Sequence, residues 1–176
     1  QQWCNMSEIK TVVDGDQIQY EGLIDLKGLY RMIDKWFSVR GFDKMETKNY
    51  EEVYEEGKQV TLEIIPYKKI TDYVKIEIKV TGYFTHLNDV EIEKNGAKLH
   101  LVKGKASIIF DAYHTTDYEG TWETRAVFHF FRTLFDKFIY KQYSEASEAA
   151  AKQHCTDLKN EVKSFNEKFQ AFNIES

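Results

Sequence analysis

The chain has 176 residues, of which 42% are hydrophobic, 30% are charged and 15% are aromatic, with a single proline. These values are typical of one soluble globular domain with a sizeable core, and they exclude an intrinsically disordered chain. The net charge of −5 argues against nucleic acid as the main partner, because affinity for nucleic acid depends on Lys and Arg that neutralise phosphates.

Cysteine usage and hydropathy bear on the location of the protein. Cys4 and Cys155 lie near opposite ends of the sequence, and they lack the CxxC spacing of a metal or redox site. We interpret them as free thiols in a reducing compartment, with a disulfide between them as the alternative. The sequence shows no signal-peptide pattern and no membrane span, so we expect a cytoplasmic protein.

The first part of the chain predicts two short strands and a helix. Ile9–Val13 and Gln17–Ile24 alternate apolar and polar residues on either side of an Asp-Gly-Asp break. Asp25 is a suitable N-cap for a helix over Leu26–Phe37, and Gly41 is expected to end that helix.

A long run of antiparallel strands is predicted next. Strand 73–83 has the clearest pattern, with Val74, Ile76, Ile78 and Val80 on one face and Lys75, Glu77 and Lys79 on the other. Asn95-Gly96 is a strong two-residue hairpin signal, and Lys103-Gly104-Lys105 predicts a further tight turn. The predicted strands are 44–56, 59–67, 73–83, 89–94, 97–102 and 106–113.

The most hydrophobic segment runs from Trp122 to Tyr143 and has the pattern of an amphipathic helix with a wide apolar arc. The arc contains Val127, Phe128, Phe131, Leu134, Phe135, Phe138 and Ile139. Each buried ring of this kind contributes roughly 1.5–3 kcal/mol, so this helix is expected to anchor a core. The opposite side, with Arg125 and Arg132, is either a solvated face or a small basic ridge.

The C-terminal segment predicts a second amphipathic helix with a narrow apolar stripe. The stripe consists of Leu158, Val162, Phe165, Phe169 and Phe172 at four-three spacing. Such a stripe needs a partner surface, either the domain itself or a second chain. Because Lys75, Glu77 and Lys79 make the outward side of their strand a poor apolar surface, the sequence slightly favours packing against a second chain. Truncation after Tyr143 is then expected to leave a folded domain with a changed association state.

Together these elements predict an α+β fold, with a curved antiparallel sheet of about six to seven strands gripped by the aromatic helix. We expect a domain at 9–143 and a helical extension at 144–176. Between Gln17 and Tyr143 the order of elements resembles the helix-grip fold of the START and Bet v1-like superfamily. The Gly-rich loop of the plant members is absent, with Glu55-Glu56-Gly57-Lys58 at that turn. ITDYVKIEIKV and RTLFDKFIYK are also similar to small uncharacterised archaeal proteins, which implies no activity.

Candidate catalytic residues lie in the predicted loop Asp111 to Glu119. Asp111, His114 and Asp117 follow one another at three-residue steps, a pattern that could serve acid–base chemistry or a metal. No third imidazole or thiol accompanies them, and we predict neither a metal site nor a cofactor. His86, His100 and His154 are expected at the surface. The GxSxG, HExxH, Walker A and GxGxxG motifs are all absent from the sequence.

These patterns favour a non-enzymatic binding protein over an enzyme of a standard class. In the first version an apolar small molecule lies between sheet and helix, with cavity candidates Ile76, Ile78, Phe110, Phe131, Phe135 and Phe138. In the alternative, a protein or ribonucleoprotein partner or a second copy binds the C-terminal stripe together with Arg125 and Arg132. An enzyme that uses Asp111, His114 and Asp117 is the third hypothesis.

Overall fold

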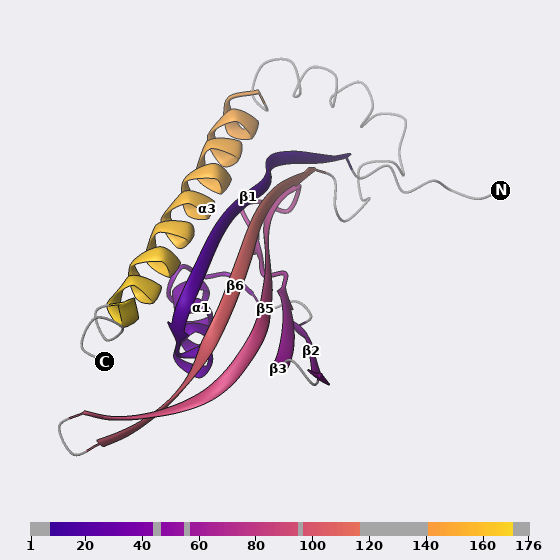
Figure 1. The fold of residues 1–176 in the computed structure, drawn as a ribbon. Helices are drawn as coiled ribbons and strands as arrows, with labels where there is room; N and C mark the ends of the chain where they lie inside the picture. Colours follow the sequence, from indigo (N-terminus) through magenta and orange to yellow (C-terminus); the bar gives the residue numbers. More distant parts are fainter. Residues whose placement is uncertain (1–7, 44–46, 55–56, 95–96, 117–140, 171–176) are drawn as a thin grey trace.

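The computed structural model describes residues 8–43, 47–54, 57–94, 97–116 and 141–170 (Figure 1). Its strands are β1 (Glu8–Ile24), β2 (Thr47–Tyr54), β3 (Gly57–Ile64), β4 (Tyr67–Lys69), β5 (Val74–Lys94) and β6 (Ala97–Thr116). Its helices are α1 (Leu26–Val39) and α3 (Lys141–Gln170). The predicted aromatic helix lies outside the described residues except for its last three positions, which begin α3.

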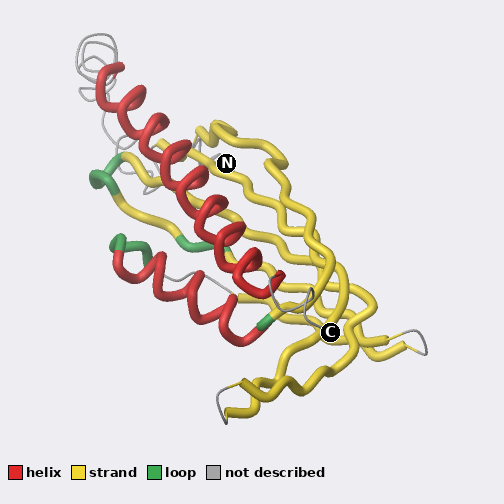
Figure 2. Tube along the Cα trace, turned by 60° about the vertical axis from the view of Figure 1, so that its left-hand side comes forward, coloured by secondary structure: helices red, strands yellow, loops and turns green. Residues whose placement is uncertain are grey.

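The strands form one open antiparallel sheet in the order β1-β6-β5-β3-β2, with β4 paired to β5. The α+β class and the antiparallel pairing are thereby confirmed. Both described helices lie on the same side of the sheet (Figure 2). The molecule is built from two layers, with the core between sheet and helices.

Strand β5 shows why the sheet has one apolar face. Val74, Ile76, Ile78 and Val80 are fully buried, whereas Lys75 and Lys79 alternate with them on the opposite side. We call the face with Ile76 and Ile78 the inner face and the face with Lys75 and Lys79 the outer face. On the outer face Lys79 forms an ion pair with Glu63 across the strands at 3.0 Å. The period-two prediction for this segment is confirmed.

Two predicted interruptions of the strands lie inside longer strands. The Asp14-Gly15 break is part of β1, where Gly15 adopts a φ of 63° and the register to β6 shifts. The predicted turn at Gly104 is wrong, because β6 continues through this residue. A side chain at Gly104 would lie 2.7 Å from the carbonyl oxygen of Thr85, where β5 bulges. The glycine permits close approach of two backbones rather than a turn.

Helix α1 follows its sequence signals. The Asp25 side chain accepts a hydrogen bond from the Gly28 amide at 2.8 Å, which is the predicted N-cap. Beyond the helix, Gly41 has a φ of 71°, a conformation that glycine adopts readily, and its amide donates to the Ser38 carbonyl. Leu29, Ile33, Trp36 and Phe37 are the buried side chains of α1.

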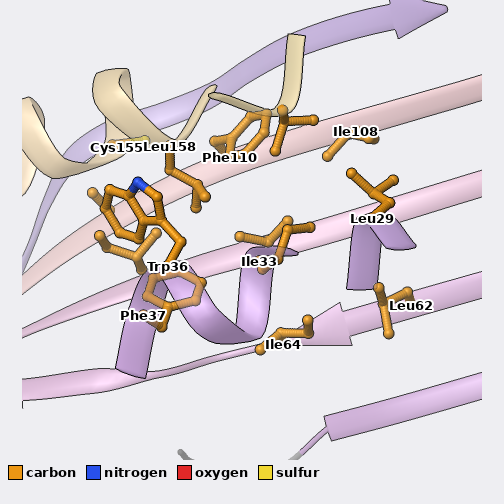
Figure 3. Packing of buried hydrophobic residues seen from close by; sticks show 14 of the residues in the cluster. Leu29, Ile33, Trp36, Phe37, Leu62, Ile64, Ile108, Phe110, Cys155 and Leu158 are labelled. Atoms are coloured by element: carbon orange, nitrogen blue, oxygen red, sulfur yellow. The ribbon is translucent and has the colours of Figure 1, made fainter. Parts of the chain in front are cut away.

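Helix α3 packs on β1, β5, β6 and α1, and it contributes directly to the core. Leu158 and Cys155 belong to the same cluster of buried residues as Phe110 of β6 and Ile33 of α1 (Figure 3). The preference for intermolecular packing of the stripe is therefore wrong for Leu158 and Val162, which are both fully buried within the chain. That preference rested on the charged outer face, whereas α3 lies against the apolar inner face.

Two ion pairs between α3 and β1 accompany this packing. Lys10 of β1 contacts Glu148 of α3 at 2.7 Å, and Lys159 of α3 pairs with Asp16 at the β1 bulge. Such exposed or half-exposed pairs contribute roughly 0–1 kcal/mol each, so the buried apolar residues supply most of the attachment.

Candidate ligand cleft

A cleft of about 870 Å³ lies between the first half of α1 and the inner face of the sheet. Its apolar floor comes from both layers of the molecule. Leu29 contributes from α1 and Leu62 from the facing strand β3, and Figure 3 labels both side chains. The apolar lining residues are Ile24, Leu26, Leu29, Tyr30, Val60, Leu62, Phe84, Val90, Leu101 and Val102. Val60 pairs in register with Phe84, and Ile24 pairs with Val102, so the two side chains of each pair lie next to each other on the sheet.

One wall of the cleft is supplied by the long hairpin of β5 and β6. The pairing of β1 ends at Ile24 with Val102, and that of β3 ends at Lys58 with Leu87. Beyond these points the hairpin continues as a two-stranded ribbon that projects from the sheet (Figure 1). Asp89, Glu91 and His100 at the base of this ribbon line the cleft.

The rim of the cleft is charged. On the strand side Glu51 pairs with Lys58 at 2.6 Å, and Glu91 lies 3.3 Å from the His100 ring. On the helix side the rim carries Lys27 and the exposed Arg31. An apolar floor with a few polar groups at its edge is the usual composition of a small-molecule site.

The structure places the predicted cavity residues elsewhere. Ile76, Ile78 and Phe110 are fully buried in the core, and none of the three lines this cleft. The half-buried Phe165 ring stacks edge-on with Phe169 at 5.5 Å. Six further predicted site residues lie outside the described part of the chain: Arg125, Phe131, Arg132, Phe135, Phe138 and Phe172.

The candidate acid–base residues Asp111 and His114 are not brought together. The segment predicted as a loop is strand through Thr116, so a three-residue step sends these two side chains to opposite faces. The Asp111 carboxylate accepts a hydrogen bond from the Gly15 amide at 2.7 Å, whereas His114 is buried on the inner face. Asp117 and Glu119 lie outside the described residues. Within residues 8–116 and 141–170, less the gaps already given, His, Cys, Asp and Glu form no group of three that could hold a metal.

His114 has a structural role under helix α3. Its Nε2 atom lies 2.8 Å from the Ser147 hydroxyl, which itself donates to the Ser144 carbonyl. We therefore assign the proton to Nε2, which donates to Ser147. Burial lowers the pKa of His114 and keeps the ring neutral, although the nearby Glu148 opposes this shift.

His154 of α3 was predicted at the surface but lies among aromatic rings. Its ring is edge-on to Trp36 and Phe42, at centroid distances of 6.0 and 5.4 Å. The Arg40 guanidinium lies 4.0 Å from the Trp36 ring, and the Lys68 ammonium 5.7 Å from the Phe42 ring. Burial, followed by these two cations, lowers the pKa of His154. The sequence carries little signal of this, because Trp36 and Phe42 precede His154 by more than a hundred positions.

The described cysteine is an inert core residue. Cys155 is free and buried, and burial raises the pKa of its thiol to about 11. Cys4, its suggested disulfide partner, lies outside the described residues.

Neither described helix combines the length and the apolar character that membrane crossing requires. No protein-family model matches the chain, and no curated protein or solved structure matches it either. The helix-grip resemblance therefore stays a prediction.

Proposed function

We propose that the protein is a non-enzymatic binding protein that holds an apolar small molecule in the cleft between α1 and the sheet. The observation that carries this proposal is the cleft itself. Its volume of about 870 Å³ is within the range of roughly 300–1,000 Å³ that is usual for ligand sites.

Incomplete burial of the lining supports an apolar ligand. Leu26, Tyr30, Val60 and Val102 are only half-buried, although they pack against the core. A molecule in the cleft would remove this surface from water, which is worth about 25 cal/mol for each Å² of apolar area. The cleft lies beside α1, whereas the sequence placed the ligand beside helix 122–143.

The chemistry of the lining supports binding rather than catalysis. Of the described residues that line the cleft, none is Ser, Thr or Cys, so no such nucleophile faces the ligand. The pair of Glu91 and His100 lies at the rim with side chains that are 61% and 73% exposed. A catalytic pair is usually more shielded from water, because shielding strengthens its electrostatic effect.

The alternative of a protein or ribonucleoprotein interaction module has less support. Leu158 and Val162 are buried in the core and cannot contact a partner, and Phe165 packs against the core. The basic ridge with Arg125 and Arg132 lies outside the described residues. We therefore place the binding function in the cleft.

Filling the cleft tests the proposal. We expect the Val60→Trp variant to bind the neutral apolar dye Nile red about tenfold more weakly than the parent chain, because the indole occupies the floor. Ile9→Trp is the matched control, since Ile9 is exposed on β1 and does not line the cleft. Dye titration by fluorescence measures affinity, and thermal unfolding checks that both variants fold.

Val102→Trp is a second variant that fills the cleft, and it keeps the test valid if Val60→Trp does not fold. Native mass spectrometry of the parent chain gives the stoichiometry, which we expect to be one molecule for each chain. A parent chain that does not bind the dye would refute the proposal. So would two folded filling variants that bind it as tightly as the parent.

A further inference from the structure

The two walls of the cleft differ in charge. The α1 wall carries two exposed cations, Lys27 and Arg31, which are four residues apart and therefore lie on the same side of the helix. Neither forms an ion pair with another described residue. On the strand wall, Glu51 is compensated by Lys58, and Glu91 has His100 beside it. Asp89, on the same wall, has no ion-pair partner among the described residues.

The first turn of α1 adds to the positive potential of its wall. A helix N-terminus carries a partial positive charge and is usually accompanied by acidic side chains in its first turn. In α1 this turn has no acidic residue, and Lys27 stands there instead. The Asp25 carboxylate is engaged as the cap of the Gly28 amide. An anion beside Lys27 would relieve this unfavourable arrangement.

The apolar floor and the cationic wall together define the shape of the ligand. We infer that the cleft takes an amphiphile with an apolar chain on the floor and one anionic head group, such as a carboxylate, between Lys27 and Arg31. Arginine suits this role because its planar guanidinium can hold a carboxylate through two hydrogen bonds. This inference rests on the proposed function and specifies its ligand class.

A comparison of three amphiphiles with the same chain length tests the head group. Dodecanoate, 1-dodecanol and dodecyltrimethylammonium are titrated against the complex of the parent chain with Nile red, below their micelle-forming concentrations. We expect dodecanoate to displace the dye at a concentration about tenfold lower than dodecanol, and the cationic amphiphile to displace it least. The advantage of dodecanoate should shrink as salt is added, because Arg31 and Lys27 are at an exposed rim.

Charge reversal on α1 identifies the residues responsible. Arg31→Glu should abolish the preference for dodecanoate over dodecanol while dodecanol still displaces the dye. Lys152→Glu is the control, because Lys152 is an exposed cation of helix α3 that does not line the cleft. It should leave the preference unchanged, and Lys27→Glu should reduce it.

The outcomes separate this inference from the proposed function. If dodecanoate and dodecanol displace the dye equally well, the anionic head group is overturned, but the proposal that the cleft binds an apolar molecule is not. A preference for the cationic amphiphile would also overturn the anionic head group, and it would place a cationic head group at Asp89. A preference for dodecanoate that survives both Arg31→Glu and Lys27→Glu would remove the α1 wall as its site. Failure of the parent chain to bind any probe would refute the proposed function as well.

Discussion

At the scale of single residues, His154 shows how a polar side chain can join an apolar interface. Its ring packs edge-on against two aromatic rings of the segment that includes α1, and its buried Nδ1 atom has no hydrogen-bond partner among the described residues. Burial lowers the pKa of this ring most, Lys68 and Arg40 lower it further, and Asp157 opposes them. A proton on this ring would place a third positive charge beside two existing ones in a poorly solvated position.

Acidification is therefore expected to destabilise the protein through His154. Its folded-state pKa is lowered from the ordinary histidine pKa of about 6.5, so the unfolded chain binds the proton first as the pH falls below that pKa. Stability is then lost as the pH falls, until the folded state is protonated as well. His114 adds to this loss of stability at low pH, because burial also lowers its pKa. Urea unfolding between pH 7.5 and pH 5 measures the effect.

The His154→Phe variant isolates this contribution. Phenylalanine keeps an aromatic ring between Trp36 and Phe42 but cannot be protonated, so the loss of stability on acidification should be smaller than in the parent chain. Thr156→Ala, an exposed substitution on the same helix that removes no titratable group, is the control and should leave the loss unchanged. If His154→Phe shows the full acid-dependent loss, the histidine does not couple pH to folding.

At the scale of elements, the C-terminal helix shows what its apolar period could and could not predict. The four-three spacing predicts the stripe that begins at Leu158 and its need for a partner surface. Its continuation through Ala151 and Cys155 was missed, because small residues carry a weak hydrophobic signal although both are fully buried. The surface that α3 covers consists of β1, β5 and β6, which come together only after residues far apart in sequence have paired, such as Glu8 with Thr116.

A cavity under α3 tests the strength of this attachment. Leu158→Ala should lower the free energy of unfolding by about 2–5 kcal/mol, because Leu158 is fully buried between α3 and the sheet. Thr156→Ala, on the exposed side of the same helix, should change it by less than about 0.5 kcal/mol. Chemical denaturation gives both values. A cost below about 1 kcal/mol for Leu158→Ala would contradict the described packing.

At the scale of the whole molecule, local patterns predicted the fold class better than the site. Alternation in β5 and the Asn95-Gly96 signal predicted an antiparallel sheet, and Lys94 indeed pairs with Ala97. The cleft, by contrast, depends on where each strand stops relative to its neighbours. One of its walls is the part of the β5–β6 hairpin that extends past the pairing of β1 and β3, and no local pattern encodes that difference in reach. Lys27 and Arg31 therefore look like ordinary surface cations in the sequence.

Removal of the C-terminal helix is the most demanding test of the two-layer architecture. The sequence pattern alone suggested that a chain ending at Tyr143 folds, but the structure leads to the opposite expectation. That truncation removes Ala151, Cys155, Leu158 and Val162 from the core and uncovers Phe110, which lies beside Leu158 in Figure 3. Each large buried side chain contributes roughly 1.5–3 kcal/mol, against a total stability of about 5–15 kcal/mol for a typical domain. We expect chain 1–143 to lose cooperative unfolding.

Thermal unfolding followed by circular dichroism measures this loss, and chain 1–170, which keeps every described residue, serves as the control. Addition of a peptide of residues 141–170 should restore part of the cooperative transition, because the peptide supplies the missing apolar face of the core. The peptide with Leu158→Ala should restore less. A chain 1–143 that unfolds cooperatively within a few degrees of the control would show that the sheet and α1 form a stable core without α3, and that the buried stripe adds little to it.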